Sequence, residues 1–241
     1  LDRICQKLQL KPTDHVLEIG TGWGGFALYA ATRYGCRVTT TTISKEQHEY
    51  AAQRIRKAGL EDRVTLLFDD YRNLEGSYDK LVSIEMIEAI GHRYFDTYFS
   101  KCAGLLKADG MMLLQSITIA DQRYAAARKS IDYIQRYIFP GGCLPSVAAL
   151  SDAIARKTDM RIFHMEDIGP HYATTLRLWR ERFLANIEKI TQLGYTERFI
   201  RMWQYYLCYC EGGFRQQSIG TVQLLLTKPQ VLRPPLTSTD C

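Results

Sequence analysis

The sequence predicts an α/β fold of the Rossmann-like type, with a mostly parallel seven-stranded sheet, helices on both faces and a helical insertion before the last strand. Three observations lead to this prediction. Strand and helix patterns alternate along the first half, a glycine-rich turn follows the first apolar strand, and the alternation stops near residue 121. Strands that alternate with helices indicate parallel pairing. A helical insertion placed late in such a fold is where a substrate pocket is usually built.

The elements follow in order along the chain. Ser44 suits a helix N-cap, and Gln47 stands three residues later in the capping-box position. We expect strands over residues 15–20, 36–41, 63–68, 78–84, 111–117, 160–165 and 221–227. We expect helices over residues 23–34, 44–59, 94–106, 121–137, 147–156, 174–193 and 196–214.

The length and composition fit one domain. The chain has 241 residues, 46% of them apolar and 24% charged, which is ordinary for a globular protein with a full core. We expect a domain over residues 1–230, with the helical insertion at about 121–214, and a flexible Pro-rich tail over 231–241. The chain opens with Leu1 rather than Met, so we also expect an upstream segment.

The net charge and the cysteine content indicate the kind of partner and the cellular location that we expect. The net charge of +5 suits an anionic partner, although a solvated basic surface without a partner remains an alternative. Arg177, Arg180 and Arg182 are interleaved with apolar residues, which favours an anionic phospholipid surface over nucleic acid. Seven cysteines without a C-x-x-C pair give no zinc or redox signature, so we expect no metal and a reducing, cytoplasmic location.

The glycine turn is the strongest local motif. Residues 18–24 read E-x-G-x-G-x-G, which resembles the S-adenosylmethionine signature of Rossmann-like methyltransferases. Glu18 lies inside the strand, where it can accept from a ligand's ammonium group. No acid follows the second strand, where a dinucleotide's ribose would need one. We expect the cofactor to contact Glu18, Gly20, Thr21, Gly22, Trp23, Gly24, Thr42, Ile43, Gln47, Asp70 and Tyr71, with Gln47 at the ribose and Asp70 and Tyr71 near the adenine.

Several longer stretches extend the resemblance over nearly the whole chain. Residues 137–146 read Y-I-F-P-G-G-C-L-P-S, a stretch that ordinary methyltransferases lack. Further matching stretches are residues 20–25, 42–47, 70–72, 171–176 and 205–214. With these stretches the chain resembles the cyclopropane fatty acid synthases and the related mycolic acid cyclopropane synthases, and it shares Gln115 and the Glu88–Ala89 pair with plant-type members.

The resemblance implies a reaction and a set of catalytic residues. A methyl group passes from S-adenosylmethionine to the cis double bond of an unsaturated phospholipid acyl chain, and loss of a proton closes a cyclopropane. The resemblance implies a bound bicarbonate as proton acceptor, held by Glu88, Tyr172, a histidine and the backbone at Thr21. The histidine is replaced here by Gln115, which can donate a hydrogen bond but carries no charge. Thr21 replaces the usual cysteine.

Each of these residues also has a structural interpretation. Glu88 suits the first turn of a helix, and Tyr172 suits a packed aromatic with a bonded hydroxyl. Cys210 matches a family cysteine once proposed as catalytic, and it also suits the wall of a pocket. Phe199, Trp203, Tyr206 and Cys210 share one helix face, which predicts either core packing or the wall of an acyl tunnel.

Two alternative functions remain. One is a methyltransferase that acts on a small-molecule amine, and the other is a catalytically silent protein that binds lipid or cofactor. For the main prediction we expect a peripheral protein at the inner membrane surface, with a homodimer as a further candidate assembly.

Overall fold

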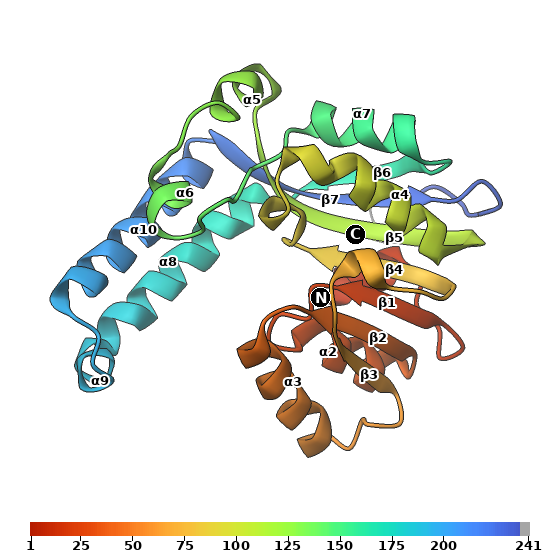
Figure 1. Cartoon of the computed structure of the whole chain (residues 1–241), viewed down its shortest axis with the longest axis horizontal. Helices are drawn as coiled ribbons and strands as arrows, with labels where there is room; N and C mark the ends of the chain where they lie inside the picture. Colours follow the sequence, from red (N-terminus) through yellow and green to blue (C-terminus); the bar gives the residue numbers. More distant parts are fainter. Residues whose placement is uncertain (237–241) are drawn as a thin grey trace.

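The computed structural model describes residues 1–236 and contains one seven-stranded sheet in the order β3-β2-β1-β4-β5-β7-β6 (Figure 1). The strands are β1 (His15–Ile19), β2 (Arg37–Thr42), β3 (Val64–Phe68), β4 (Tyr78–Ile84), β5 (Leu106–Ile119), β6 (Arg161–Asp167) and β7 (Ile219–Thr227). The neighbours from β3 to β5 pair in parallel, whereas β7 runs antiparallel to both β5 and β6. This arrangement confirms the predicted Rossmann-like, mostly parallel sheet.

The strand order reverses between β1 and β4, where ligands bind in doubly wound folds. The loops that follow β1, β2, β3 and β4 leave the sheet at this carboxyl edge. The predicted cofactor and catalytic residues of the first half therefore gather at one edge of the molecule.

Helices cover both faces of the sheet (Figure 1). Alternate residues of β1 divide between the two faces: Val16 joins one buried cluster and Leu17 the other. The first face is covered by α1 (Asp2–Lys7), α2 (Gly25–Tyr34) and α3 (Lys45–Lys57), and the second by α4 (Phe95–Leu105) and α7 (Val147–Lys157).

The region expected as one helical insertion consists of two separate parts. The first contains α5 (Asp121–Ala127) and α6 (Tyr133–Tyr137), after β5. The second contains α8 (Gly169–Ala185), α9 (Ile187–Gln192) and α10 (Glu197–Arg215), between β6 and β7. The intervening α7 and β6 belong to the sheet and its covering layer.

Two helices predicted as continuous are interrupted. The helix predicted over residues 121–137 divides because Asp132 starts a new one: its side chain accepts from the Gln135 amide, and Gln135 returns the bond in a capping box. The helix predicted over residues 174–193 begins earlier, at Gly169. It ends at Asn186, whose backbone leaves the helical region and whose side chain donates to the Arg182 carbonyl at 2.7 Å.

Helices α8 and α10 pack side by side and extend away from the sheet, with α9 at the far end (Figure 1). They form what we call the helical hairpin, residues 169–215. It leaves the sheet at the carboxyl edge, because β6 runs into α8 and β7 begins beside the end of β5.

The segment after β7 has neither helix nor strand up to residue 236. Val231 is buried, and Arg233 donates to the Lys7 carbonyl at 2.6 Å. The rest of the predicted tail, residues 237–241, lies outside the described residues. Within residues 1–236, no helix has the length and apolar character needed to cross a membrane.

Candidate active site

The glycine turn adopts backbone conformations that side chains rarely tolerate. Gly20, Gly22 and Gly24 have φ values of 100°, 52° and 79°. A Cβ atom on Gly20 would lie 3.1 Å from Cγ of Met86, and one on Gly24 would lie 3.3 Å from Cβ of Ala51. The turn therefore lies directly against the residues that follow β4.

Glu18 is buried beneath this turn. One carboxylate oxygen accepts from the Thr40 hydroxyl at 2.6 Å, and the Thr40 and Thr21 hydroxyls are 2.7 Å apart. Burial raises the pKa of Glu18 to about 8, and the bond from Thr40 partly opposes this rise. A ligand's ammonium group beside this carboxyl would favour its ionised form.

The predicted residues after β2 form a short hydrogen-bonded loop. Thr42 donates to the Gln47 side chain at 2.9 Å, and Ser44 accepts from the Gln47 backbone amide at 3.3 Å. The capping box is therefore only half formed, because the Gln47 side chain bonds to Thr42 instead of the Ser44 amide. Ile43 and Trp23 are exposed large apolar side chains beside this loop and the glycine turn.

The two residues predicted near the adenine differ in their surroundings. Asp70 accepts two side-chain bonds from Arg72, which hold the pKa of Asp70 below its ordinary value. Tyr71 is buried, and its ring meets that of Tyr98 edge-on at 5.5 Å. The Tyr71 ring is therefore part of the core, and its contact with a cofactor stays a prediction.

Glu88 lies in the short 3₁₀ turn Ile87–Ala89, after β4. One carboxylate oxygen accepts from the Ser116 hydroxyl at 2.9 Å and from the Ile117 amide at 2.6 Å. The other oxygen is buried and has no hydrogen-bond partner among residues 1–236. Burial raises the pKa of Glu88 to about 7, and the charge of Glu85 contributes to the rise.

The Y-I-F-P-G-G-C-L-P-S stretch over residues 137–146 lies against Glu88. The Cys143 amide donates to the Glu88 carbonyl at 2.7 Å, and the Ile119 amide donates to the Pro145 carbonyl at 2.9 Å. A Cβ atom on Gly142 would lie 3.1 Å from the Phe139 carbonyl oxygen. This stretch therefore fixes the turn that carries Glu88 and shields it.

A second glutamate, Glu85, shares the site and was not singled out from the sequence. It follows β4 with φ of 52°, a conformation that costs a non-glycine residue about 1 kcal/mol or more. One carboxylate oxygen accepts from the Gln115 side chain at 2.8 Å, and the other from the Tyr172 hydroxyl at 2.6 Å. An acid placed directly after a strand at the carboxyl edge was the available sequence signal.

Gln115 belongs to a chain of hydrogen bonds through the sheet. Its side-chain oxygen accepts from Gln223 at 2.9 Å, and the Gln223 oxygen accepts from the ammonium group of Lys7 at 2.6 Å. Lys7 is fully buried and also pairs with Glu166. The sheet places Gln115 directly opposite Gln223 on β7 and beside Ile84 on β4.

The groups expected to hold bicarbonate do not leave an anion site between them. The donors of Gln115 and Tyr172 are directed at Glu85. The Thr21 amide donates to the Thr41 carbonyl at 2.9 Å, and the Thr21 carbonyl accepts from Gly24 at 2.9 Å. A further anion would also lie beside two glutamates, so the residues present do not fit bicarbonate.

The helical hairpin forms an aromatic wall over this site. Tyr172 of α8 stacks on Phe214 of α10 with ring centroids 4.7 Å apart, and burial, followed by Glu85, raises the pKa of Tyr172. Phe199, Trp203 and Tyr206 pack in a row along α10, with centroids 5.6 Å and 5.2 Å apart.

Cys210 lies in the same buried cluster as Tyr172 and Tyr206. Burial raises the pKa of Cys210 to about 12, so the group is a neutral thiol near pH 7. A neutral thiol suits the wall of an apolar pocket better than acid–base chemistry.

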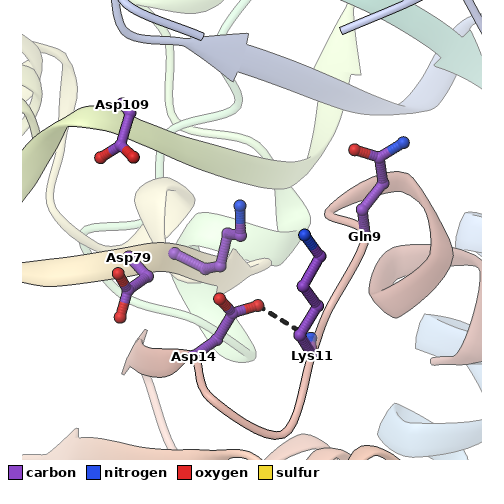
Figure 2. Close-up of a pocket in the computed structure, with 6 residues that line it drawn as sticks. Gln9, Lys11, Asp14, Asp79 and Asp109 are labelled. Carbon is purple, nitrogen blue, oxygen red and sulfur yellow. Dashed lines mark hydrogen bonds between the residues drawn. The ribbon is translucent and has the colours of Figure 1, made fainter. Parts of the chain in front are cut away.

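A separate polar pocket lies at the opposite edge of the sheet (Figure 2). Asp14 precedes β1 and Asp79 stands at the start of β4, and Figure 2 shows both side chains beside Lys11 and Asp109. This pocket contains none of the predicted site residues. The candidate active site therefore consists of residues at the carboxyl edge of the sheet and on the helical hairpin, and this pocket is separate from it.

Together the fold and the glycine turn define a class I S-adenosylmethionine-dependent methyltransferase fold. The family described as mycolic acid cyclopropane synthetase matches residues 1–224, and the chain belongs to this family. The expected resemblance is thus confirmed.

Named relatives support the same assignment. The chain is 42% identical over 228 residues to the tuberculostearic acid methyltransferase UfaA1 of Mycobacterium tuberculosis, covering 95% of this chain and 53% of that protein. It is 42% identical over 229 residues to the cyclopropane-fatty-acyl-phospholipid synthase of Escherichia coli, covering 95% of this chain and 57% of that protein. The chain therefore spans little more than half the length of these two relatives.

A solved structure matches the fold closely. The mycolic acid cyclopropane synthase CmaA1, complexed with SAH and CTAB, superposes with a TM-score of 0.85 at 30% identity, covering 92% of this chain and 80% of that one. The residues of the glycine turn fit such a cofactor, because a Cβ atom on Gly22 would meet nothing within 4 Å and the turn leads into the exposed Trp23.

Proposed function

We propose that this protein transfers a one-carbon unit from S-adenosylmethionine to the cis double bond of an unsaturated phospholipid acyl chain and forms a cyclopropane. The observation that carries the proposal is the meeting of three features at one edge. The glycine turn lies against Met86, the half-buried Glu85 and Glu88 stand on either side of Met86 in the sequence, and Tyr172, whose ring stacks on Phe214, bonds to Glu85. S-adenosylmethionine supplies an electrophilic methyl group.

The proposed roles of the chain's residues follow from their chemistry. Glu18 and the glycine turn hold the cofactor, with Thr42, Ile43, Gln47, Asp70 and Tyr71 around it. An alkene is a weak nucleophile, so Tyr206, Trp203 and Cys210 would exclude water and hold the chain in line. The π faces of the aromatic rings favour the carbocation that methyl transfer creates. Glu88 lies where its charge would also stabilise that cation.

The named relatives include enzymes that act on other lipids, among them sphingolipid C9-methyltransferases from fungi. The buried apolar cluster of the hairpin supports a long-chain lipid over a small amine, because an amine would not need an apolar wall of this kind. A methyl branch instead of a ring, an amine substrate and a silent binding protein are the alternative outcomes of the tests below.

We propose further that the protein works at the cytoplasmic face of the inner membrane, bound to an anionic surface. The net charge of +5 supports attraction to such a surface. The two helical parts carry nine exposed large apolar side chains, namely Ile131, Tyr137, Phe139, Leu178, Trp179, Leu193, Tyr195, Tyr205 and Tyr209. A homodimer is an additional proposal, which sedimentation velocity would test.

Glu88→Gln tests the catalytic assignment. The amide keeps the size of the side chain but carries no charge, so we expect turnover to fall by about 100-fold or more while S-adenosylhomocysteine binds unchanged. Release of S-adenosylhomocysteine in the presence of unsaturated phospholipid vesicles measures turnover, and calorimetric titration measures binding. Glu75→Gln, at an exposed position before β4, is the matched control. Equal turnover of the two variants would show that Glu88 has no catalytic role.

A further inference from the structure

Glu85 places a carboxylate where the family resemblance requires an external anion. Tyr172 and Gln115 were expected to bind bicarbonate, and both donate instead to Glu85, at 2.6 Å and 2.8 Å. Each carboxylate oxygen receives one of these bonds. The side chain therefore has the hydrogen-bond pattern of a bound anion while belonging to the chain itself.

The direction of the hydrogen-bond chain shows that Glu85 acts as an acceptor. Lys7 has only donors, so the Gln223 oxygen must face it and the Gln223 amide must face Gln115. The same logic directs the Gln115 amide at Glu85. The buried Lys7 ammonium group therefore fixes the orientation of the Gln223 and Gln115 side-chain amides. As a result, the Gln115 amide donates to the carboxylate at the end of the chain.

The neighbouring carboxyl behaves differently. One Glu88 carboxylate oxygen is buried without a hydrogen-bond partner in the described residues, and burial raises the pKa of Glu88 to about 7. Two carboxyl groups whose surroundings differ in this way can take different roles in one reaction. A bound bicarbonate would be a third anionic group beside these two carboxyl groups. Neither Tyr172 nor Gln115 would have a free donor to bind it, because both donate to Glu85.

We propose that the Glu85 carboxylate is the proton acceptor of the reaction and replaces bicarbonate in this protein. The inference rests on the proposed function. The alkene's π electrons form a bond to the transferred methyl carbon, while the electrons of the carbon–sulfur bond stay on sulfur as a neutral thioether. Glu85 then takes a proton from the added methyl group, and the electrons of that C–H bond close the ring onto the cationic carbon. Glu85 is left as a neutral acid, which returns its proton to solvent before the next turnover.

The strained backbone of Glu85 supports a functional reason for the residue. A φ of 52° favours glycine, and the Glu85 side chain at this position accepts hydrogen bonds from Tyr172 and Gln115. Glu85→Gly therefore fits the backbone and opens the anion site, whereas Glu85→Gln keeps the volume but removes the base.

The first test compares turnover in buffer freed of carbon dioxide with turnover in buffer containing added bicarbonate. We expect the wild-type rate to agree within about twofold in the two buffers. We expect the turnover of Glu85→Gln to fall by about 100-fold, since general-base catalysis contributes about 10²–10⁴-fold. Without bicarbonate, the turnover of Glu85→Gly should fall by a similar factor. Added bicarbonate should restore at least about tenfold to Glu85→Gly, because its two donors are then free. Gln9→Gly, which has the same φ of 52° at an exposed position away from the site, is the matched backbone control and should match wild type.

A second readout does not depend on turnover. Isotopically labelled bicarbonate, followed by NMR line broadening, should bind Glu85→Gly and not the wild type. A wild-type enzyme that binds the label and needs bicarbonate for turnover would overturn the inference and leave the proposed function intact. Full turnover of Glu85→Gly without bicarbonate would overturn it as well. Absence of turnover in wild type under every condition would instead contradict the proposed function, and the labelled-bicarbonate result would still decide whether Glu85 fills the anion site.

Discussion

Two glutamates three positions apart meet different surroundings at the end of β4. Glu88 is held on one oxygen by Ser116 and the Ile117 amide, while its second oxygen is buried without a partner in the described part of the chain. Glu85 has donors on both oxygens. A third acid, Glu18, lies under the glycine turn with one hydroxyl donor. In the proposed reaction Glu88 stabilises the lipid cation, Glu85 accepts the proton, and Glu18 binds the ammonium group of the cofactor.

The pKa of Glu18 leads to a pH prediction. Because burial raises this pKa to about 8, the carboxyl of the free protein is mostly protonated at pH 7. A bound ammonium favours the ionised form and lowers the pKa, so binding releases a proton. The affinity for S-adenosylhomocysteine should therefore rise with pH up to about 8.

Calorimetric titration in buffers of different ionisation enthalpy measures the proton release. Glu18→Gln should bind more weakly and show only the ligand's own ionisation, so the difference between the two proteins isolates Glu18. A wild type whose proton release equals that of Glu18→Gln would contradict the role of Glu18.

The sequence predicted part of the site at the residue scale. Tyr172 and Gln115 both bond to Glu85, and Glu88 lies three residues further along the chain, while their catalytic roles stay a prediction. Glu85 was missed because its importance depends on a cross-strand neighbour, Gln115, and on a tyrosine of α8 far along the chain. Hydrogen-bond direction through Gln223 to Lys7 also depends on sheet pairing, which no local pattern of residues contains.

At the scale of elements, short-range chemistry explains most boundaries. The predicted strand over residues 78–84 and the predicted N-cap Ser44 match the structure, because apolar runs and side-chain caps act locally. The single helices predicted over residues 121–137 and 174–193 were wrong, because polar residues in their middle start or end helices through their own side chains. The short α1 was not predicted, since six residues carry too little periodicity.

Gly20 is the position in the turn where an added methyl group should do most damage. Gly20→Ala places Cβ 3.1 Å from Met86 at φ of 100°. We expect the free energy of unfolding to fall by about 1–3 kcal/mol and the affinity for S-adenosylhomocysteine to fall by at least about tenfold. Chemical denaturation and calorimetric titration measure the two effects.

Gly104→Ala is the matched control. Gly104 lies in α4, and its Cβ would meet nothing within 4 Å. The free energy of unfolding of this variant should rise by about 0.5–1 kcal/mol, and its affinity for S-adenosylhomocysteine should equal that of the wild type. If Gly20→Ala binds as well as Gly104→Ala, the turn does not hold the cofactor.

At the scale of the whole molecule, the sheet and the helical hairpin contribute different parts of the candidate site. The sheet brings the loops after β1, β2, β3 and β4 to one edge, and the helical hairpin leaves the sheet on the same side (Figure 1). The hairpin and the segment containing α6 also carry many of the exposed apolar side chains. We propose that this side of the molecule faces the membrane and receives the acyl chain.

Vesicle binding tests the membrane proposal. Ile131 and Leu193 are 77% and 75% exposed in the helical parts. Replacing both with serine should weaken binding to anionic vesicles by about tenfold or more, since each buried aliphatic side chain contributes about 1.5–3 kcal/mol. Neutral vesicles should bind more weakly than anionic ones, and salt should reduce the difference.

Leu232→Ser is the control for this experiment. Leu232 is 97% exposed, and it follows β7 at the opposite edge of the sheet, beyond the bond from Lys228 to the Gly110 carbonyl. Its replacement should leave vesicle binding unchanged. Equal effects of the two sets of substitutions would show that binding does not involve the helical parts.

The most direct test of the account is mass spectrometry of phospholipid acyl chains after incubation of vesicles with the protein and S-adenosylmethionine. The account predicts that monounsaturated chains gain one CH₂ unit, that saturated chains gain nothing, and that NMR of the product shows ring protons. Unchanged unsaturated chains, with cofactor binding demonstrated separately and a small amine methylated in their place, would contradict it.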